Sequence, residues 1–80
     1  MTRIIKANGG INSFTTNTNL SNGANDIVHG LNTDAIIVSF FKADQSIELD
    51  YELKSGSETT TITVNIIGVQ NDVDINIIAL

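Results

Sequence analysis

His29 is the only histidine of the chain, and it is the one plausible general base in the sequence. Asp26, Thr33 and Asp34 lie within five residues of it, so an acid and a nucleophile for a catalytic triad can be drawn from the same segment. A simpler interpretation is a histidine at a strand end that bonds a backbone group of the adjoining turn. We therefore predict that the chain is not an enzyme and has no catalytic residues.

Acidic residues form a second candidate site. Glu48, Asp50 and Glu52 alternate with apolar residues, which places three carboxylates on one face of a strand. Ca²⁺ takes about six to eight oxygen ligands from a looped chain, whereas such neighbours lie ~6–7 Å apart along a straight strand. An acidic face that opposes edge-to-edge aggregation is the simpler interpretation. The segment 71–74 is likewise typical of a turn, so we predict no metal and no cofactor.

The length of the chain favours association with other chains. Eighty residues are enough for one domain, and the absence of cysteine excludes a disulfide or a thiolate metal site. A single core of this size supplies about 3–5 kcal/mol of net stability. Oligomerisation is the remaining way to add to it, so we predict a homo-oligomer.

The charge distribution excludes two classes of partner. The net charge is −5, and the four basic residues, Arg3, Lys6, Lys42 and Lys54, are scattered. Phosphate groups and anionic lipids are both recognised by clustered Lys and Arg. We therefore expect neither a nucleic acid nor a membrane as partner. Residues 1–10 lack the apolar core of a signal peptide, and we expect synthesis in the cytoplasm.

Alternation of apolar and polar residues predicts strands throughout the second part of the chain and no helix. The clearest case has Ile47, Leu49, Tyr51 and Leu53 on one side of one strand. The predicted strands cover residues 26–29, 34–43, 46–54, 59–67 and 73–80. We therefore expect an all-β fold, a small antiparallel β-sandwich over residues 26–80.

Residues 1–25 differ in composition from the rest of the chain. They are rich in Asn, Thr, Ser and Gly and contain few apolar residues, which is too little apolar surface to fold alone. We predict an extended N-terminal arm that is ordered by contact with a neighbour or with the sheet. A disordered terminus is the alternative.

Two predicted strands are apolar on both faces. In residues 34–43, Ile37 and Phe41 lie opposite the face that carries Phe40, and in the last strand Ile78 and Leu80 lie opposite Ile75 and Ile77. A soluble monomer rarely exposes such a patch. We predict that it is covered by another subunit or partner, or alternatively by the arm within a monomer. The predicted interface residues are Ile4, Ile5, Phe14, Ile37, Phe41, Ile78 and Leu80.

The segment 28–38, VHGLNTDAIIV, carries a resemblance to a known class of proteins. Its pattern of His29, Leu31 and Thr33 before an apolar strand resembles the entry to small β-sandwich modules of tailed-phage virion proteins. These are capsid decoration proteins, head fibres and tail-fibre tips. The resemblance covers residues 26–80 and implies a virion component, made in the host cytoplasm, commonly homotrimeric, whose arm docks on the particle.

The resemblance leads to two functional hypotheses. The chain has no fibre shaft and no repeat, which favours a structural virion protein, a minor capsid or capsid-surface component that assembles through its arm and apolar faces. Its partners would be its own copies, in a trimer, and other capsid or tail proteins. The alternative is a receptor- or glycan-binding tip that uses the loops 30–33, 43–46, 55–58 and 68–72. Those loops contain no aromatic residue. An inhibitor or regulatory protein is a third class.

Overall fold

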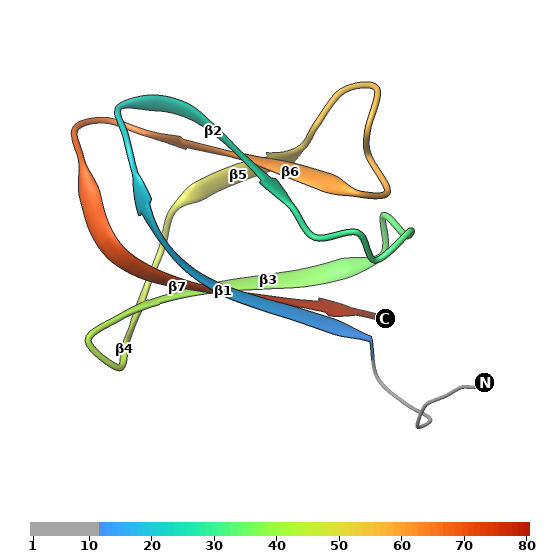
Figure 1. The fold of residues 1–80 in the computed structure, drawn as a ribbon, viewed down its shortest axis with the longest axis horizontal. Coiled ribbons are helices and arrows are strands. Elements are labelled where there is room, and N and C mark those ends of the chain that lie inside the picture. The colour runs from blue at the N-terminus through green and yellow to red at the C-terminus, as the bar shows by residue number, and fades with distance from the viewer. Residues whose placement is uncertain (1–11) are drawn as a thin grey trace.

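The computed structural model describes residues 12–80, which form seven strands in two antiparallel sheets (Figure 1). The strands are β1 (Ser13–Leu20), β2 (Gly23–Val28), β3 (Ile36–Lys42), β4 (Gln45–Ile47), β5 (Asp50–Leu53), β6 (Thr61–Ile66) and β7 (Gln70–Ala79). Residues 12–80 contain no helix, which confirms the predicted all-β class. Within this range there is accordingly no helix of the length and apolarity that a membrane crossing needs.

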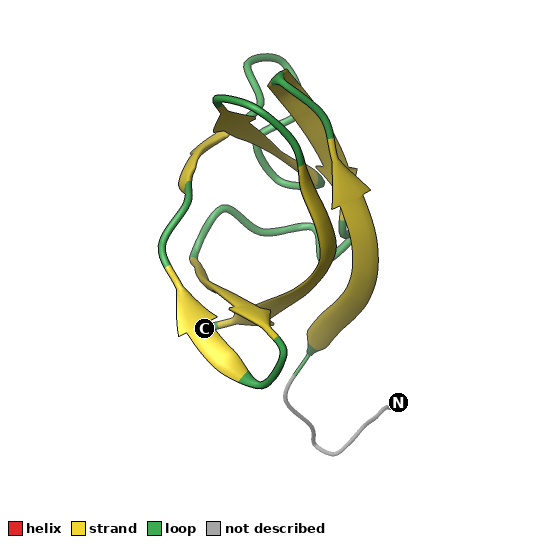
Figure 2. Ribbon diagram, turned by 90° about the vertical axis from the view of Figure 1, so that its left-hand side faces the viewer, coloured by secondary structure: helices red, strands yellow, loops and turns green. Residues whose placement is uncertain are grey.

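The two sheets stack as the layers of a sandwich (Figures 1 and 2). The four-stranded sheet has the order β1-β7-β3-β4, and the three-stranded sheet has the order β2-β6-β5. The chain passes from one layer to the other after β1, β2, β4 and β6. Only two pairs of consecutive strands stay within a layer: β3 and β4 in the four-stranded sheet, and β5 and β6 in the three-stranded sheet. Ala43 and Asp44 both have positive φ, 52° and 64°, as the two-residue β3–β4 turn requires.

The core lies between the layers and follows the period of two in the strands. Ile75 of β7 lies opposite Thr16 of β1 and Phe40 of β3 in the four-stranded sheet. Ile62 of β6 lies opposite Ile27 and Leu53 in the other sheet. The fully buried apolar residues are Leu20, Phe40, Ile62, Val64, Val73, Ile75 and Ile77. Both sheets therefore contribute to one apolar interior.

The prediction of a single strand over residues 46–54 is wrong. β4 belongs to the four-stranded sheet and β5 to the three-stranded sheet, and Glu48 and Leu49 form the link between the layers. Leu49 packs against the core, as do Ile47 of β4 and Leu53 of β5. Because the link is also apolar at this inward position, the alternation continues across it and gives no sign of the change of sheet.

The boundary predicted between an arm over 1–25 and a body over 26–80 is not a structural boundary. Residues 13–20 are extended, as predicted, but they form β1 and pair with β7 from Ser13↔Ile78 to Leu20↔Gln70. The division at residue 25 falls inside β2. The predicted interface residues Ile4 and Ile5 lie outside the described residues. Within residues 12–80 the sandwich therefore begins at β1, which lies inside the predicted arm.

Truncation of a core residue tests this arrangement. Ile75 is 1% exposed and Ile67, in the loop before β7, is 98% exposed. We expect Ile75→Ala to lower the free energy of unfolding by about 3 kcal/mol, because it leaves a cavity between the sheets. Ile67→Ala, the matched control, changes it by less than about 0.5 kcal/mol. Urea unfolding measures both, and equal losses would contradict the assignment of the core.

Candidate assembly surface

The outer face of the four-stranded sheet carries an apolar patch. Ile37 of β3 lies directly opposite Ile78 of β7, and the Leu80 amide donates a hydrogen bond of 2.8 Å to the Ala35 carbonyl oxygen, which continues the pairing. Ile37 is 53% exposed and Leu80 is 77% exposed. Alternation turns these side chains away from the core, which lies on the other face. We call Ala35, Ile37, Ile78 and Leu80 the outer patch.

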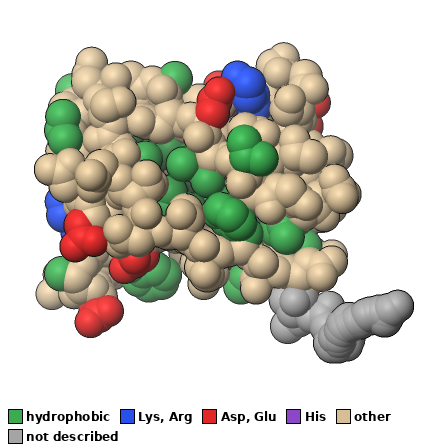
Figure 3. All heavy atoms as spheres, in the orientation of Figure 1, with side chains coloured by type: hydrophobic (Ala, Val, Ile, Leu, Met, Phe, Trp, Pro, Cys, Tyr) green, Lys and Arg blue, Asp and Glu red, His purple; other side chains and the backbone are tan. Residues whose placement is uncertain are grey.

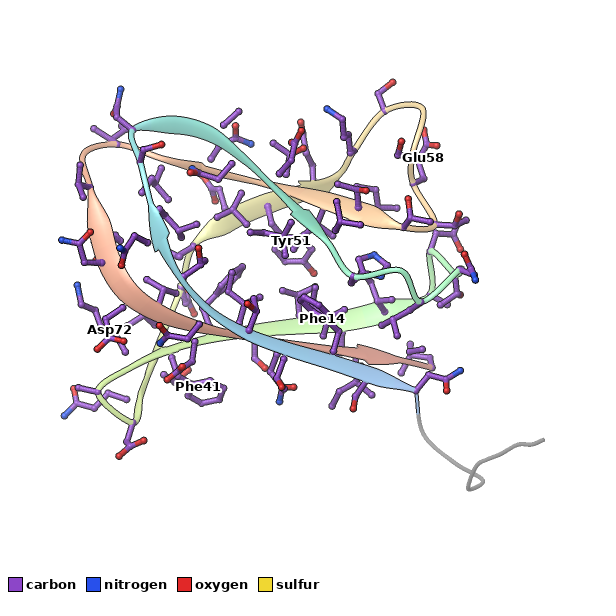
Figure 4. All side chains as sticks on the ribbon, in the orientation of Figure 1. Phe14, Phe41, Tyr51, Glu58 and Asp72 are labelled. Carbon is purple, nitrogen blue, oxygen red and sulfur yellow. The ribbon has the colours of Figure 1, made fainter. Side chains whose placement is uncertain are left out.

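The structure separates two other predicted interface residues from the outer patch. Phe41 projects from the same face, away from the three-stranded sheet (Figure 4), but it lies opposite Asp74. A polar row with Ser39 opposite Asn76 lies between it and the patch. Phe14 lies opposite Ile77 and packs against the core from the inner face. Of the predicted interface residues that the structure describes, only Ile37, Ile78 and Leu80 come together.

Sequence reasoning left Ala35 out of the predicted interface. The signal for it is its position two residues before Ile37, on the same face of the same predicted strand. Its small side chain adds little apolar area by itself. It does, however, continue the patch to the end of the sheet, where it faces Leu80.

The outer face of the three-stranded sheet is mainly polar, although Val28 of β2 is 66% exposed there. Thr63 of β6 donates a hydrogen bond of 2.8 Å to the Asp26 carboxylate, and Lys54 forms an ion pair of 2.9 Å with the same group. The bonds from Lys54 and from Thr63 lower the pKa of Asp26. Thr61 and Thr63 are buried beneath this layer. Val28 lies opposite Thr61, so this face has no directly opposed apolar pair like Ile37 and Ile78.

Hydrophobic side chains also appear at the open flank of the sandwich. In Figure 3 they gather near the middle of the view, between the two layers. β1 and β2 are the edge strands of their sheets on this side (Figure 1). Phe14 and Ile27, from these two strands, are partly buried against the core. This flank is thus an extension of the core, in contrast to the outer patch.

His29 and its neighbours hold a loop in place. The His29 amide donates a hydrogen bond of 2.8 Å to the Thr60 carbonyl oxygen, and its ring Nδ1 accepts one of 3.1 Å from the Leu31 amide. The Thr33 amide bonds the Thr59 carbonyl oxygen at 3.0 Å. Leu31 packs against the core. His29 therefore bonds backbone groups at a strand end, as predicted, and the hydrogen bonds of residues 12–80 join it to no side chain.

The other ring nitrogen of His29 has an unusual environment. The side chain is 6% exposed, and Nε2 is buried without a hydrogen-bond partner among the described residues. Because Nδ1 accepts a bond from the Leu31 amide, this geometry assigns the proton of the neutral ring to Nε2. Burial lowers the pKa of His29, since a charged ring would lose its contact with water.

The acidic candidates form no metal site. Glu48, in the link, and Asp50 and Glu52, in β5, are all exposed, and within residues 12–80 no group of three potential ligands could hold a metal ion. In the 71–74 segment, the Asn17 amide nitrogen donates to Asp72 at 2.8 Å and to Asp74 at 2.9 Å. These two carboxylates therefore bind a side chain of β1 and tie β7 to that strand. The prediction of a turn over 71–74 is wrong, because these residues lie within β7.

Comparison of the chain with protein-family models, with curated proteins and with solved structures gave no match. The function is therefore argued from the surface and the sequence pattern. The outer patch is the candidate functional site, and the segment around His29 supports the sandwich beside it.

The environment of His29 predicts a pH-dependent stability. In the folded protein its pKa lies below the ordinary value of 6.5. Between these two values the unfolded chain binds more protons than the folded one, so the free energy of unfolding is highest above about pH 6.5 and falls as the pH decreases. Chemical denaturation between about pH 7 and about pH 5.5 measures this slope.

The variant His29→Asn is the control for this slope. Its side-chain oxygen can still accept the Leu31 amide, and it does not titrate. We expect the slope in this window to be lost, because ordinary carboxyl groups titrate at about pH 4. An unchanged slope would assign the pH dependence to another group.

Proposed function

We propose that this chain is a structural virion protein whose copies assemble into a homotrimer through the outer patch. The observation that carries this proposal is the Ile37–Ile78 pair on the outer face of a sheet whose inner face already packs against the core. A sheet that is apolar on both faces is typical of a layer that is covered on both sides. Other capsid or tail proteins are the further partners in this proposal.

The size of the outer patch limits how much free energy it can contribute to association. Covering three large aliphatic side chains stabilises an assembly by about 5 kcal/mol per subunit. Association itself costs about 4–15 kcal/mol in lost freedom of motion. The patch therefore supplies a large share of the association free energy, and the trimer needs further contacts from another part of the chain.

The virion role rests on the sequence pattern together with this surface. The segment 28–38, which resembles phage β-sandwich modules, includes the start of β3, where Ile37 lies. The hydrogen bonds of His29 go to backbone groups, which favours a supporting role over a catalytic one. The chain thus functions by assembly on the particle surface. No observation favours the receptor-binding tip, whose candidate loops lack aromatic residues.

The mass in solution tests the assembly. Light scattering over a dilution series should give a mass near three times the 8.6 kDa of the chain. Ile37→Ser should raise the concentration needed for half-assembly at least about tenfold, because it removes a covered apolar side chain. Ile67→Ser has the same chemistry at a fully exposed loop position and should change nothing. A monomer at every concentration would contradict the proposal.

A further inference from the structure

Half of β3 has a free edge. β4 pairs with β3 only from Phe40↔Ile47 to Lys42↔Gln45, and the chain then leaves for the other sheet. On the side away from β7, the part of β3 before Phe40 has no strand beside it among the described residues. Its outward backbone N–H and C=O groups can therefore pair with an added strand.

A groove lies along this free edge. It has a volume of about 490 Å³ and lies between β3 and the segment 46–51. Its apolar lining comes from Val38, Phe40, Ile47, Leu49 and Tyr51. The Tyr51 ring, which Figure 4 shows between the two layers, lies 6.0 Å from the Phe40 ring. The groove is therefore walled by both sheets and open on its outer side.

The rim of the groove is acidic. Glu48 and Asp50 both line it, and both are exposed. A free strand edge, an apolar lining and an acidic rim together fit an extended peptide in which apolar residues are flanked by basic ones.

This chain contains such a segment outside the described residues. Residues 3–6 read Arg-Ile-Ile-Lys, and residues 1–11 contain no acidic residue. All nine acidic residues lie in residues 12–80, where the basic residues are Lys42 and Lys54. The N-terminal segment and the sandwich are therefore opposite in charge.

We infer that the groove binds residues 2–6 of a second copy of this chain, added as a strand along the free edge of β3. This inference rests on the proposed function and names a further contact of the assembly. Successive side chains of an added strand point to opposite faces. One of Ile4 and Ile5 then enters the groove, and the other lies on the outer face beside Ile37, where it extends the outer patch.

The path that the chain would have to follow favours a second copy over the same chain. The Ala79 amide donates to the Asn12 carbonyl oxygen, so the N-terminal segment is joined to the sandwich at a residue beside β7. To reach the free edge of its own β3 it would cross about three strand spacings, ~14 Å, and reverse its direction. Six residue steps reach at most about 20 Å when fully extended, so the same chain could make the crossing and the reversal only with most of its link stretched. Exchange between copies has no such limit.

Disulfide trapping tests this contact, because the chain has no cysteine of its own. Two single variants, Lys6→Cys and Glu48→Cys, are mixed in denaturant, refolded together and oxidised. We expect a disulfide that joins position 6 of one chain to position 48 of another, identified by mass spectrometry. Lys6→Cys mixed with Glu58→Cys is the matched control, since Glu58 is an exposed acid outside the groove, and its yield should be at least tenfold lower.

The outcomes distinguish the inferred contact of residues 2–6 from the proposed assembly. A yield at the control level would overturn the inference, and so would a double variant, Lys6→Cys with Glu48→Cys, that closes its disulfide only within one chain. If the unmodified chain is then still an oligomer by light scattering, the proposed function stands without this contact. A chain that is monomeric at every concentration would contradict both the inferred contact and the proposed function.

Discussion

The pairing of β7 between β1 and β3 is the interaction on which the rest of the structure depends. β7 places Val73, Ile75 and Ile77 in the core and Ile78 on the outer face. Because side chains alternate between faces, a shift of one residue would move the core residues outside and Ile78 inside. One register therefore defines the core and the candidate assembly surface together.

The crossing of the chain between β4 and β5 is the second constraint. A sandwich of this length uses one extended run, 45–53, to supply edge strands to both sheets. The crossing closes one flank, but it takes β4 away from β3 after three residue pairs. The groove and the free edge therefore arise because one short run of chain supplies an edge strand to both sheets. The proposed strand from a second copy would complete the four-stranded sheet.

The sequence was sufficient to predict the elements that depend on local alternation. The all-β class followed from the period of two, and the two-faced character of β3 followed from Ile36 and Ile37 at successive positions. The placement of Ile37, Ile78 and Leu80 on the outer face followed from the same pattern. These features need no knowledge of which strands are neighbours.

Features that depend on long-range pairing could not be read from the sequence. The Thr and Asn residues of β1 supply little apolar surface and so predict an arm, yet the strand is ordered by pairing with β7 about sixty residues away. The change of sheet after Ile47 left no signal, since Leu49 keeps the alternation. The groove that Glu48 and Tyr51 line could not be predicted for the same reason, because it exists only once the two strands separate.

The central position of β7 has a consequence for synthesis of the protein on the ribosome. β7 is the last of the seven strands to be translated, and β1 and β3 have no contact in their sheet until it is inserted between them. Ile37 and Ile78 likewise meet only at that stage. A nascent chain that stops before β7 cannot present the outer patch. In the proposed assembly, a prematurely terminated chain would therefore lack the surface that joins the copies.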